Sequence, residues 1–262
     1  MINSQQNVRI KDARKLQERR HRHKRQQFLV EGVRLIGDAL QSSVYPTLLF
    51  YVPQLVENNR AAIQLVQQIE AELPEVECLA CSQSVFGTLS DTVTPQGMVA
   101  VFALPQLTAP STPTLTLILD NVREPGNAGT LLRGAEAAGV ELVIFGPGTV
   151  DPFNSKVVRS AMGSHFRLPI RICPAWSQIG DYLPTEHCIY LAQADAKQDY
   201  DQVDWLQPTA LVISGETAGA SPVAQETAQP ISIPMLNLVE SLNAAMAGTV
   251  ILFEAARQRR YR

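Results

Sequence analysis

Apolar positions follow two alternating patterns along this chain. Short, nearly continuous apolar runs are typical of buried strands, and apolar residues spaced three or four apart are typical of helices that cover them. In the first part of the chain the pattern predicts a strand and a helix within 28–40, strands at 47–52, 75–80 and 97–104, and helices at 59–73 and 82–90. It therefore predicts a small α/β domain over residues 27–104.

The alternation stops at Pro105–Thr114, a stretch of three prolines and small polar residues that is typical of a linker. It then resumes over 115–262. The predicted strands are Leu115–Asp120, Glu141–Phe145, Leu168–Ile172, Cys188–Ala192, Ala210–Ser214 and Ile231–Ile233, and the predicted helices are Gly129–Ala138, Asn154–Met162 and Glu240–Gln258. Apolar strands that alternate with helices predict a mostly parallel sheet with helices on both faces. Ligands of such sheets bind in the loops beyond the carboxyl ends of the strands.

Charge changes this picture at the N-terminus. The 262 residues have a formal net charge of −3, but residues 9–25 hold nine Lys and Arg against two acidic residues, so this segment carries +7 and the rest −10. The nine cations are Arg9, Lys11, Arg14, Lys15, Arg19, Arg20, Arg22, Lys24 and Arg25. We interpret residues 1–26 as a basic arm for a polyanion, with a solvated charged helix as the alternative.

Composition excludes several classes. No apolar run approaches the ~20 residues that cross a bilayer, and the polar, basic N-terminal residues lack the apolar core of a signal peptide. We therefore expect a cytoplasmic protein without a membrane segment. Cys78 and Cys81 form one C-x-x-C, but a zinc site needs about four ligands. We expect reduced thiols and no metal, with redox chemistry or metal binding as the alternative.

Three strand-end loops carry the candidate chemistry. In the first, Asp120–Gly139, the glycines match neither G-x-G-x-x-G nor a P-loop. Asn127 is a candidate N-cap, and Arg133 follows one and a half turns into the predicted helix. An Arg so close to the positive end of a helix dipole suits a phosphate bound above the helix start. The alternative is a simple cap and a surface arginine.

The second and third loops follow the last two strands. Gly215 and Gly219 come directly after a strand, which suggests backbone packed against a ligand, and Glu216 between them is expected to cap a helix or to accept from Arg133. In the third loop Ser241 and Asn243 flank Leu242 at the start of an apolar helix. Two polar side chains around an apolar one suit a cofactor with a ring and a polar edge, although helix caps are the alternative.

Together the three loops resemble the motifs of the SpoU (TrmH-type) RNA ribose 2′-O-methyltransferases of the SPOUT superfamily. The matching residues are Asn127 to Arg133 for Asn-x-Gly-x-x-x-Arg, Gly215-Glu216-Thr217-Ala218-Gly219, and Ile233-Pro234-Met235 with Ser241-Leu242-Asn243. Residues 151–169 resemble the segment between the motifs, and 19–40 and 94–102 resemble the ends of the family's ribosomal-protein-like RNA-binding domain. Two positions depart from the pattern, since Ser214-Gly215 replaces Gly-Asn and Asn237 replaces Gly.

The resemblance implies a fold, a cofactor and partners. Residues 115–262 would form the methyltransferase domain with a trefoil knot, and residues 27–104 the RNA-binding domain. S-adenosylmethionine would be bound by Ser214, Gly215, Glu216, Gly219, Ile233, Met235, Ser241 and Leu242. RNA would be bound by the nine cations together with Lys156 and Arg159. The resemblance also implies a homodimer, and it needs no metal.

The resemblance further implies residue roles. Arg133 is expected to be the key catalytic residue, positioned by Asn127, Asn243 and Glu216, with Ser241 in contact with the target nucleotide. Large-subunit ribosomal RNA is the first choice of substrate and transfer RNA the second, and the modified nucleotide and the proton acceptor stay open. A non-catalytic RNA-binding or ribosome-assembly protein is one alternative. A dinucleotide-dependent oxidoreductase is another, and the missing glycine pattern argues against it.

Overall fold

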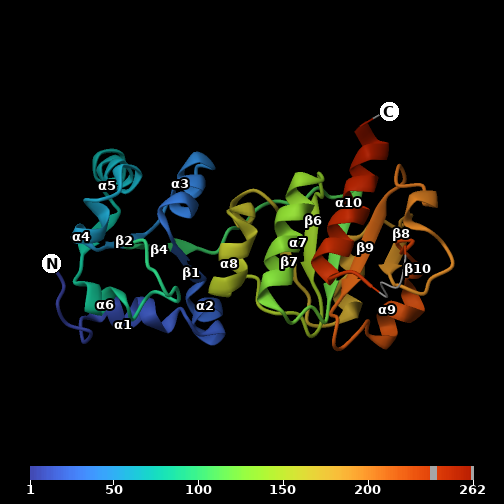
Figure 1. Cartoon of the computed structure of the whole chain (residues 1–262), viewed down its shortest axis with the longest axis horizontal. Coiled ribbons are helices and arrows are strands. Elements are labelled where there is room, and N and C mark those ends of the chain that lie inside the picture. Colours follow the sequence, from blue (N-terminus) through green and yellow to red (C-terminus); the bar gives the residue numbers. More distant parts are fainter. Residues whose placement is uncertain (237–240, 261–262) are drawn as a thin grey trace. The chain divides into compact units, whose positions relative to one another are not determined.

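The computed structural model describes residues 1–236 and 241–260 (Figure 1). The chain divides into two compact units, Met1–Pro105 with Phe153–Arg159, and Gln106–Pro152 with Ser160–Arg262. The expected linker counts with the second unit from Gln106 onward, and Arg171 Nη2 donates to Leu107 O there at 3.2 Å. Asn237, one of the two departures from the family pattern, lies outside the described residues. Within the described residues no helix is long and apolar enough to cross a membrane.

The first unit is a four-stranded mixed sheet in the order β1-β4-β2-β3. Its strands are β1 (Gln27–Glu31), β2 (Leu48–Tyr51), β3 (Glu77–Ala80) and β4 (Met98–Ala103). Strand β4 is antiparallel to β1 and β2, whereas β2 and β3 are parallel. Its helices are α1 (Val8–Lys15), α2 (Arg19–Arg25), α3 (Val33–Gln41), α4 (Pro53–Val56), α5 (Arg60–Glu72) and α6 (Gln83–Phe86). These elements confirm the alternating pattern predicted for 27–104.

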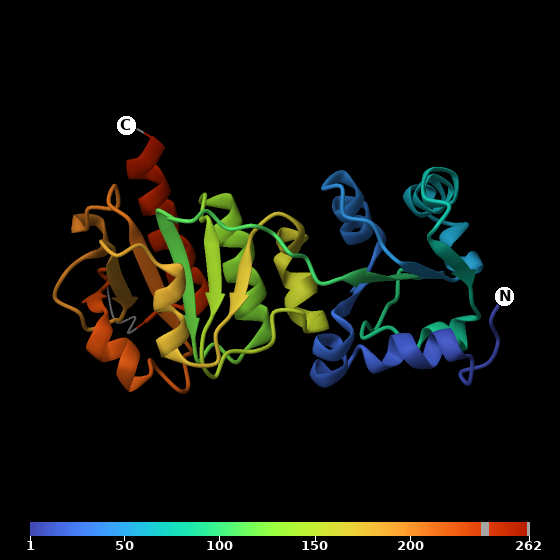
Figure 2. The same ribbon diagram turned by 180° about the vertical axis from the view of Figure 1, so that it is seen from behind.

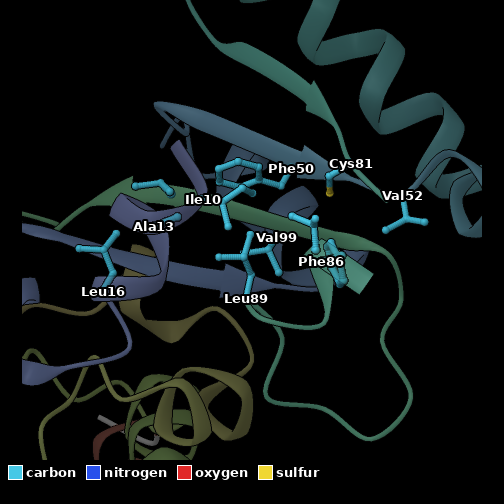
Figure 3. Packing of buried hydrophobic residues seen from close by; sticks show 11 residues of the cluster. Ile10, Ala13, Leu16, Phe50, Val52, Cys81, Phe86, Leu89 and Val99 are labelled. Atoms are coloured by element: carbon cyan, nitrogen blue, oxygen red, sulfur yellow. The ribbon is translucent and has the colours of Figure 1, made fainter. Parts of the chain in front are cut away.

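The basic N-terminal segment is part of this unit. Helix α1 begins after Asn7, whose side chain accepts from Arg9 N at 2.9 Å. Ile10, Ala13 and Leu16 on its inner side are buried in a cluster with Phe50 and Phe86 (Figure 3). Because its apolar residues fall on one face, the segment expected to be an arm covers the sheet and leaves its cations other than Arg22 on the outside.

The second unit is a six-stranded parallel sheet in the order β10-β8-β9-β5-β6-β7. Its strands are β5 (Leu115–Asp120), β6 (Leu142–Phe145), β7 (Ile170–Ile172), β8 (Cys188–Ala192), β9 (Thr209–Ser214) and β10 (Gln229–Ile231). Its helices are α7 (Pro125–Ala137), α9 (Pro222–Thr227) and α10 (Ala244–Arg260), while α8 (Ser155–Ala161) belongs to the first unit up to Arg159. Four 3₁₀ turns complete it, η1 (Ser164–Phe166), η2 (Trp176–Gln178), η3 (Gly180–Tyr182) and η4 (Tyr200–Gln202). The predicted parallel sheet is confirmed.

Several boundaries differ from the prediction by a few residues, and two of them have a clear local reason. Strand β10 ends at Ile231 rather than Ile233, and it includes Pro230, which an edge strand tolerates because one side of it makes no ladder bonds. Helix α7 begins at Pro125, four residues before the predicted start, because proline suits the first helical position and Glu124 accepts from Gly126 N at 3.4 Å. The N-cap is thus Glu124, and the assignment of Asn127 as the cap was wrong.

Both faces of the second sheet are covered, as Figures 1 and 2 show from opposite sides. Helices α7 and α10 pack together on one face. They approach so closely that a Cβ at Gly248 of α10 would lie 2.4 Å from Leu131 Cδ2 of α7. This packing places the start of α10 beside the carboxyl ends of the central strands β5 and β9.

Candidate active site

A cavity of about 420 Å³ lies in the second unit, in the size range of small-molecule sites. All eight residues expected to bind the cofactor line it: Ser214, Gly215, Glu216, Gly219, Ile233, Met235, Ser241 and Leu242. They come from the loop after β9, the segment after β10 and the residues before α10. The sequence interpretation missed Gln193 and Ala194, which follow β8, and Gln225 on α9. The end of β8 was predicted correctly, and the strand-end rule applied to it identifies the first two.

The glycines of the second loop serve the chain's own packing. A Cβ at Gly215 would lie 2.1 Å from the carbonyl oxygen of Asn121, which leaves no room for any side chain. Gly219 has φ +64°, a left-handed conformation that favours glycine. Its N–H donates to Gly215 O at 2.8 Å and closes the turn that carries Glu216. Gly215 is therefore packed against backbone of the same chain on one side, and it also lines the cavity.

Glu216 joins the three motifs. Its Oε1 accepts from Asn127 Nδ2 at 3.0 Å, from Asn243 Nδ2 at 2.7 Å and from Ala244 N at 3.1 Å. Asn243 Nδ2 also donates to Asn127 Oδ1 at 3.0 Å. A carboxylate accepts without donating, so it can hold several N–H groups at one point. Three loops distant in sequence thus meet at one side chain.

Asn243 has two functions here. Its Oδ1 accepts from Ala245 N at 3.1 Å and Met246 N at 3.3 Å, which caps α10. Its Nδ2 faces Glu216 and Asn127. The cap and the site, which were alternatives in the sequence interpretation, are both present.

Arg133 lies on α7 with its side chain exposed. In the described part of the chain it makes no hydrogen bond or salt bridge, so the expected contact with Glu216 is not formed. Its five N–H donors therefore face solvent and are available to an anion. Ser241, the residue expected to touch the target nucleotide, lies at the cavity wall.

A buried carboxylate supports the second loop. Asp120, the last residue of β5, is fully buried. Its Oδ1 accepts from Trp176 Nε1 at 2.9 Å and Ser221 Oγ at 3.1 Å, and its Oδ2 accepts from Ser221 N at 2.6 Å. Sequence reasoning treated this residue only as the end of a strand, since its partners lie far away along the chain.

The structure separates the nine N-terminal cations into two groups. Arg9 pairs with Glu77 at 2.8 Å, and Lys15 and Arg25 pair with Asp12 at 3.1 and 2.9 Å. The hydrogen bond from Arg25 holds the pKa of Asp12 below its usual value. Arg22 is 4% exposed and donates from Nη1 to Leu16 O and Gln17 O. The other five, Lys11, Arg14, Arg19, Arg20 and Lys24, are exposed and have no partner in the described part of the chain.

Two further RNA-binding candidates and the cysteines lie elsewhere. Lys156 and Arg159 belong to the first unit, where Lys156 is exposed and Arg159 is half-buried. All four cysteines are free thiols. Burial raises the pKa of Cys78 and of Cys81 to about 11, so both thiols are protonated and unreactive at neutral pH.

Comparison with known proteins places this geometry. Residues 114–253 match the SpoU rRNA Methylase family, and residues 7–100 match the MRM3-like substrate binding domain. The 23S rRNA (guanosine(2553)-2'-O)-methyltransferase RlmP of Bacillus subtilis (strain 168) is 31% identical over 261 residues, 96% of this chain and 97% of that protein. Human mitochondrial rRNA methyltransferase 3 is 33% identical over 304 residues, 92% of this chain and 70% of that protein.

The solved structures agree. The SpoU methyltransferase AviRb from Streptomyces viridochromogenes, in complex with AdoMet, has a TM-score of 0.87 and 30% identity over 97% of this chain and 99% of its own. The protein is therefore an RNA methyltransferase. It belongs to the SpoU rRNA Methylase family, whose model covers more than half of the chain.

Proposed function

We propose that this protein transfers a methyl group from S-adenosylmethionine to a ribose 2′-hydroxyl of large-subunit ribosomal RNA. The observation that carries the proposal is the meeting of Asn127 and Asn243 at Glu216, which lines the cavity after β9. RlmP, which this chain resembles over nearly its whole length, acts by its name on a guanosine 2′-oxygen of 23S rRNA. The trefoil knot and the cytoplasmic location stay predictions.

The cavity fits the cofactor in size and in chemistry. Ile213, Ile231 and Ile251 form an apolar wall, while Ser214, Gln193 and Glu216 supply polar groups at the edge. A nucleoside with a charged amino-acid tail needs such a combination. When bound, S-adenosylmethionine supplies an electrophilic methyl group on a sulfonium.

The residues beside the cavity position the RNA. Arg133 binds the phosphate next to the target ribose and so aligns the 2′-hydroxyl, which is a poor nucleophile without such alignment. Glu216 holds the amides of Asn127 and Asn243 in fixed orientations. Ser241 contacts the target nucleotide from the cavity wall. These groups reduce the conformational entropy that the transition state has to lose.

RNA binding in the first unit is carried by the five unpaired cations of α1 and α2. On α2, Arg20 and Lys24 lie one turn apart, on the side opposite the buried Arg22. Phosphate contacts of this kind supply affinity and register without reading the bases. We assign Arg9, Lys15, Arg22 and Arg25 to the structure of the unit, because each already has a partner within the unit.

A homodimer is part of the proposal. Met246, Val250 and Phe253 of α10 are 58%, 39% and 43% exposed and follow one another at spacings of four and three residues. They form an apolar stripe on the outer side of the helix, which a second copy would cover. Phe253→Asp is expected to shift the sedimentation coefficient to that of a monomer. A wild-type chain that sediments as a monomer at micromolar concentration would contradict this part of the proposal.

The test of the function is transfer of labelled methyl groups to RNA from a strain that lacks this gene. We expect label in large-subunit ribosomal RNA at one site that resists alkaline cleavage, because a 2′-O-methyl group blocks that cleavage. Arg133→Ala is expected to abolish labelling and to leave cofactor binding intact, whereas Arg60→Ala, an exposed arginine of α5, keeps full activity. Label in transfer RNA alone would show that the substrate is transfer RNA and not ribosomal RNA. Cofactor binding without label in any RNA or ribosomal particle would favour the non-catalytic alternative.

A further inference from the structure

The loop that carries Glu216 is tied at both of its ends to one residue, Asp120. At its start, Gly215 N donates to the backbone oxygen of Asp120 at 3.1 Å. At its end, Ser221 donates to the Asp120 carboxylate from both its backbone N–H and its hydroxyl, at 2.6 and 3.1 Å. The loop between these ties contributes Glu216, Gly219 and Ala220 to the cavity wall. Asp120 itself does not line the cavity.

The second tie continues into helix α9. The Ser221 hydroxyl that donates to Asp120 also accepts from Ala224 N at 3.3 Å, which makes Ser221 the N-cap of α9. That helix carries Gln225, another residue of the cavity wall. One carboxylate therefore determines where the loop ends and where α9 begins.

The third donor to the Asp120 carboxylate comes from a different element of the fold, η2. Trp176 in η2 donates its indole N–H to Asp120 Oδ1 at 2.9 Å. The indole packs against the same apolar cluster as Ala220, which includes Ile118 and Val212 of the central strands. The carboxylate is thus bonded to Trp176 as well as to the end of the loop at Ser221.

The donor set requires a carboxylate. All three partners of the side chain donate, and an acid group accepts at both oxygens, whereas an amide would turn an N–H₂ toward at least one donor. In the described part of the chain no cation pairs with Asp120. A buried carboxylate without a cation costs stability. A side chain that did no more than fill this position could be apolar, so its charge indicates a role in holding the loop.

We propose that Asp120 is a positioning residue that keeps the Gly215–Ser221 loop in the shape that binds S-adenosylmethionine. The inference rests on the proposed function, since it names what the loop binds. Asp120 acts through Ser221 and Gly215 and does not touch the cofactor. Its loss lowers cofactor affinity first, because bound cofactor itself orders the loop once the cavity is filled.

The experiment compares Asp120→Asn with wild type by calorimetric titration of S-adenosylmethionine into the full chain. We expect the dissociation constant for S-adenosylmethionine to rise about ten- to hundredfold in Asp120→Asn, which corresponds to the loss of one charge-assisted hydrogen bond. With saturating cofactor, kcat for RNA methylation is expected to stay within about threefold of wild type, so the change appears in the KM for S-adenosylmethionine.

The matched control is Thr209→Val. Thr209 is buried at the opposite end of the same strand pair, where it faces Leu115, and its hydroxyl donates to Gln207 O at 2.8 Å. This variant loses a buried hydrogen bond far from the cavity. We expect a lower melting temperature and unchanged cofactor affinity. If Thr209→Val lost as much affinity for S-adenosylmethionine as Asp120→Asn, the role of Asp120 would be purely structural and the inference would be overturned.

Two more variants keep the test decisive if Asp120→Asn does not fold. Ser221→Ala removes one loop tie and keeps the backbone one, so affinity is expected to fall about threefold. Trp176→Phe keeps both loop ties and is expected to bind nearly as well as wild type. Undiminished affinity in a folded Asp120→Asn or in Ser221→Ala refutes the inference. Failure of the wild-type chain to bind S-adenosylmethionine refutes the proposed function instead.

Discussion

Arg20 and Arg22 lie two positions apart on α2, and we expect the same substitution to affect RNA binding at Arg20 and stability at Arg22. Arg22 is buried and donates to Leu16 O at 2.9 Å and Gln17 O at 2.7 Å, at the end of α1. Arg20 is exposed and unpaired in the described part of the chain. Arg22→Gln and Arg20→Gln remove the same charge from the same helix, so they separate the structural role from RNA binding.

The magnitudes follow from these contacts. Hydrogen bonds from a charged donor contribute about 1.5–3 kcal/mol each, so loss of both in Arg22→Gln is expected to cost about 3–6 kcal/mol of unfolding free energy. That is a large share of the roughly 5–15 kcal/mol typical of a protein. Arg20→Gln changes stability by less than about 0.5 kcal/mol. It removes one phosphate contact, which lowers the slope of log affinity against log salt by about 0.7–0.9.

Urea unfolding measures the first quantity, and RNA binding at several potassium chloride concentrations measures the second. The control is Arg25→Gln, since Arg25 is paired with Asp12 and 34% exposed, and it is expected to leave the salt slope nearly unchanged. The reasoning fails if Arg22→Gln is as stable as wild type, or if Arg25→Gln lowers the salt slope as much as Arg20→Gln does.

Three further predictions concern the second unit. Glu216→Gln replaces a charged acceptor of three N–H donors with a neutral one. We expect kcat/KM in steady-state methylation to fall about 5- to 30-fold, which corresponds to about 1–2 kcal/mol after discounting for solvent exposure. Gly215→Ala places a Cβ 2.1 Å from Asn121 O, and loss of cofactor binding in calorimetry is expected because the loop must move; wild-type affinity would exclude this close approach. Burial lowers the pKa of His165 to about 4, below its unfolded value near 6.5, so the contribution of His165 to stability is constant above pH 6.5 and declines by about 3 kcal/mol as pH falls to about 4. Urea midpoints at pH 7 and pH 5 test this, and a folded His165→Asn should lose the dependence.

The local pattern of apolar and polar residues predicted most helices and strands, because it indicates which side of a segment is buried. Leu115–Asp120 and Cys188–Ala192 are continuous apolar runs, and both strands have the predicted boundaries. Pro125 and Pro230 mark two of the boundaries that differed. At both places proline is tolerated for a reason outside the local pattern, in one case the first helical position and in the other the edge of a sheet.

The sequence by itself determined the parallel sheet, the strand-end loops and the candidate side chains of the site, among them Asn127, Glu216 and Asn243. Only the tertiary structure decided how those side chains pair. Glu216 bonds to residues 89 and 27 positions away, and Asp120 to Ser221, 101 positions away. It also decided which cations of α1 and α2 are free, since Arg9 pairs with Glu77 of β3 and Arg25 with Asp12, 13 positions away. Spacing along the chain reports which face of an element is buried, whereas hydrogen-bond partners depend on which strands become neighbours, and that order is a property of the whole sheet.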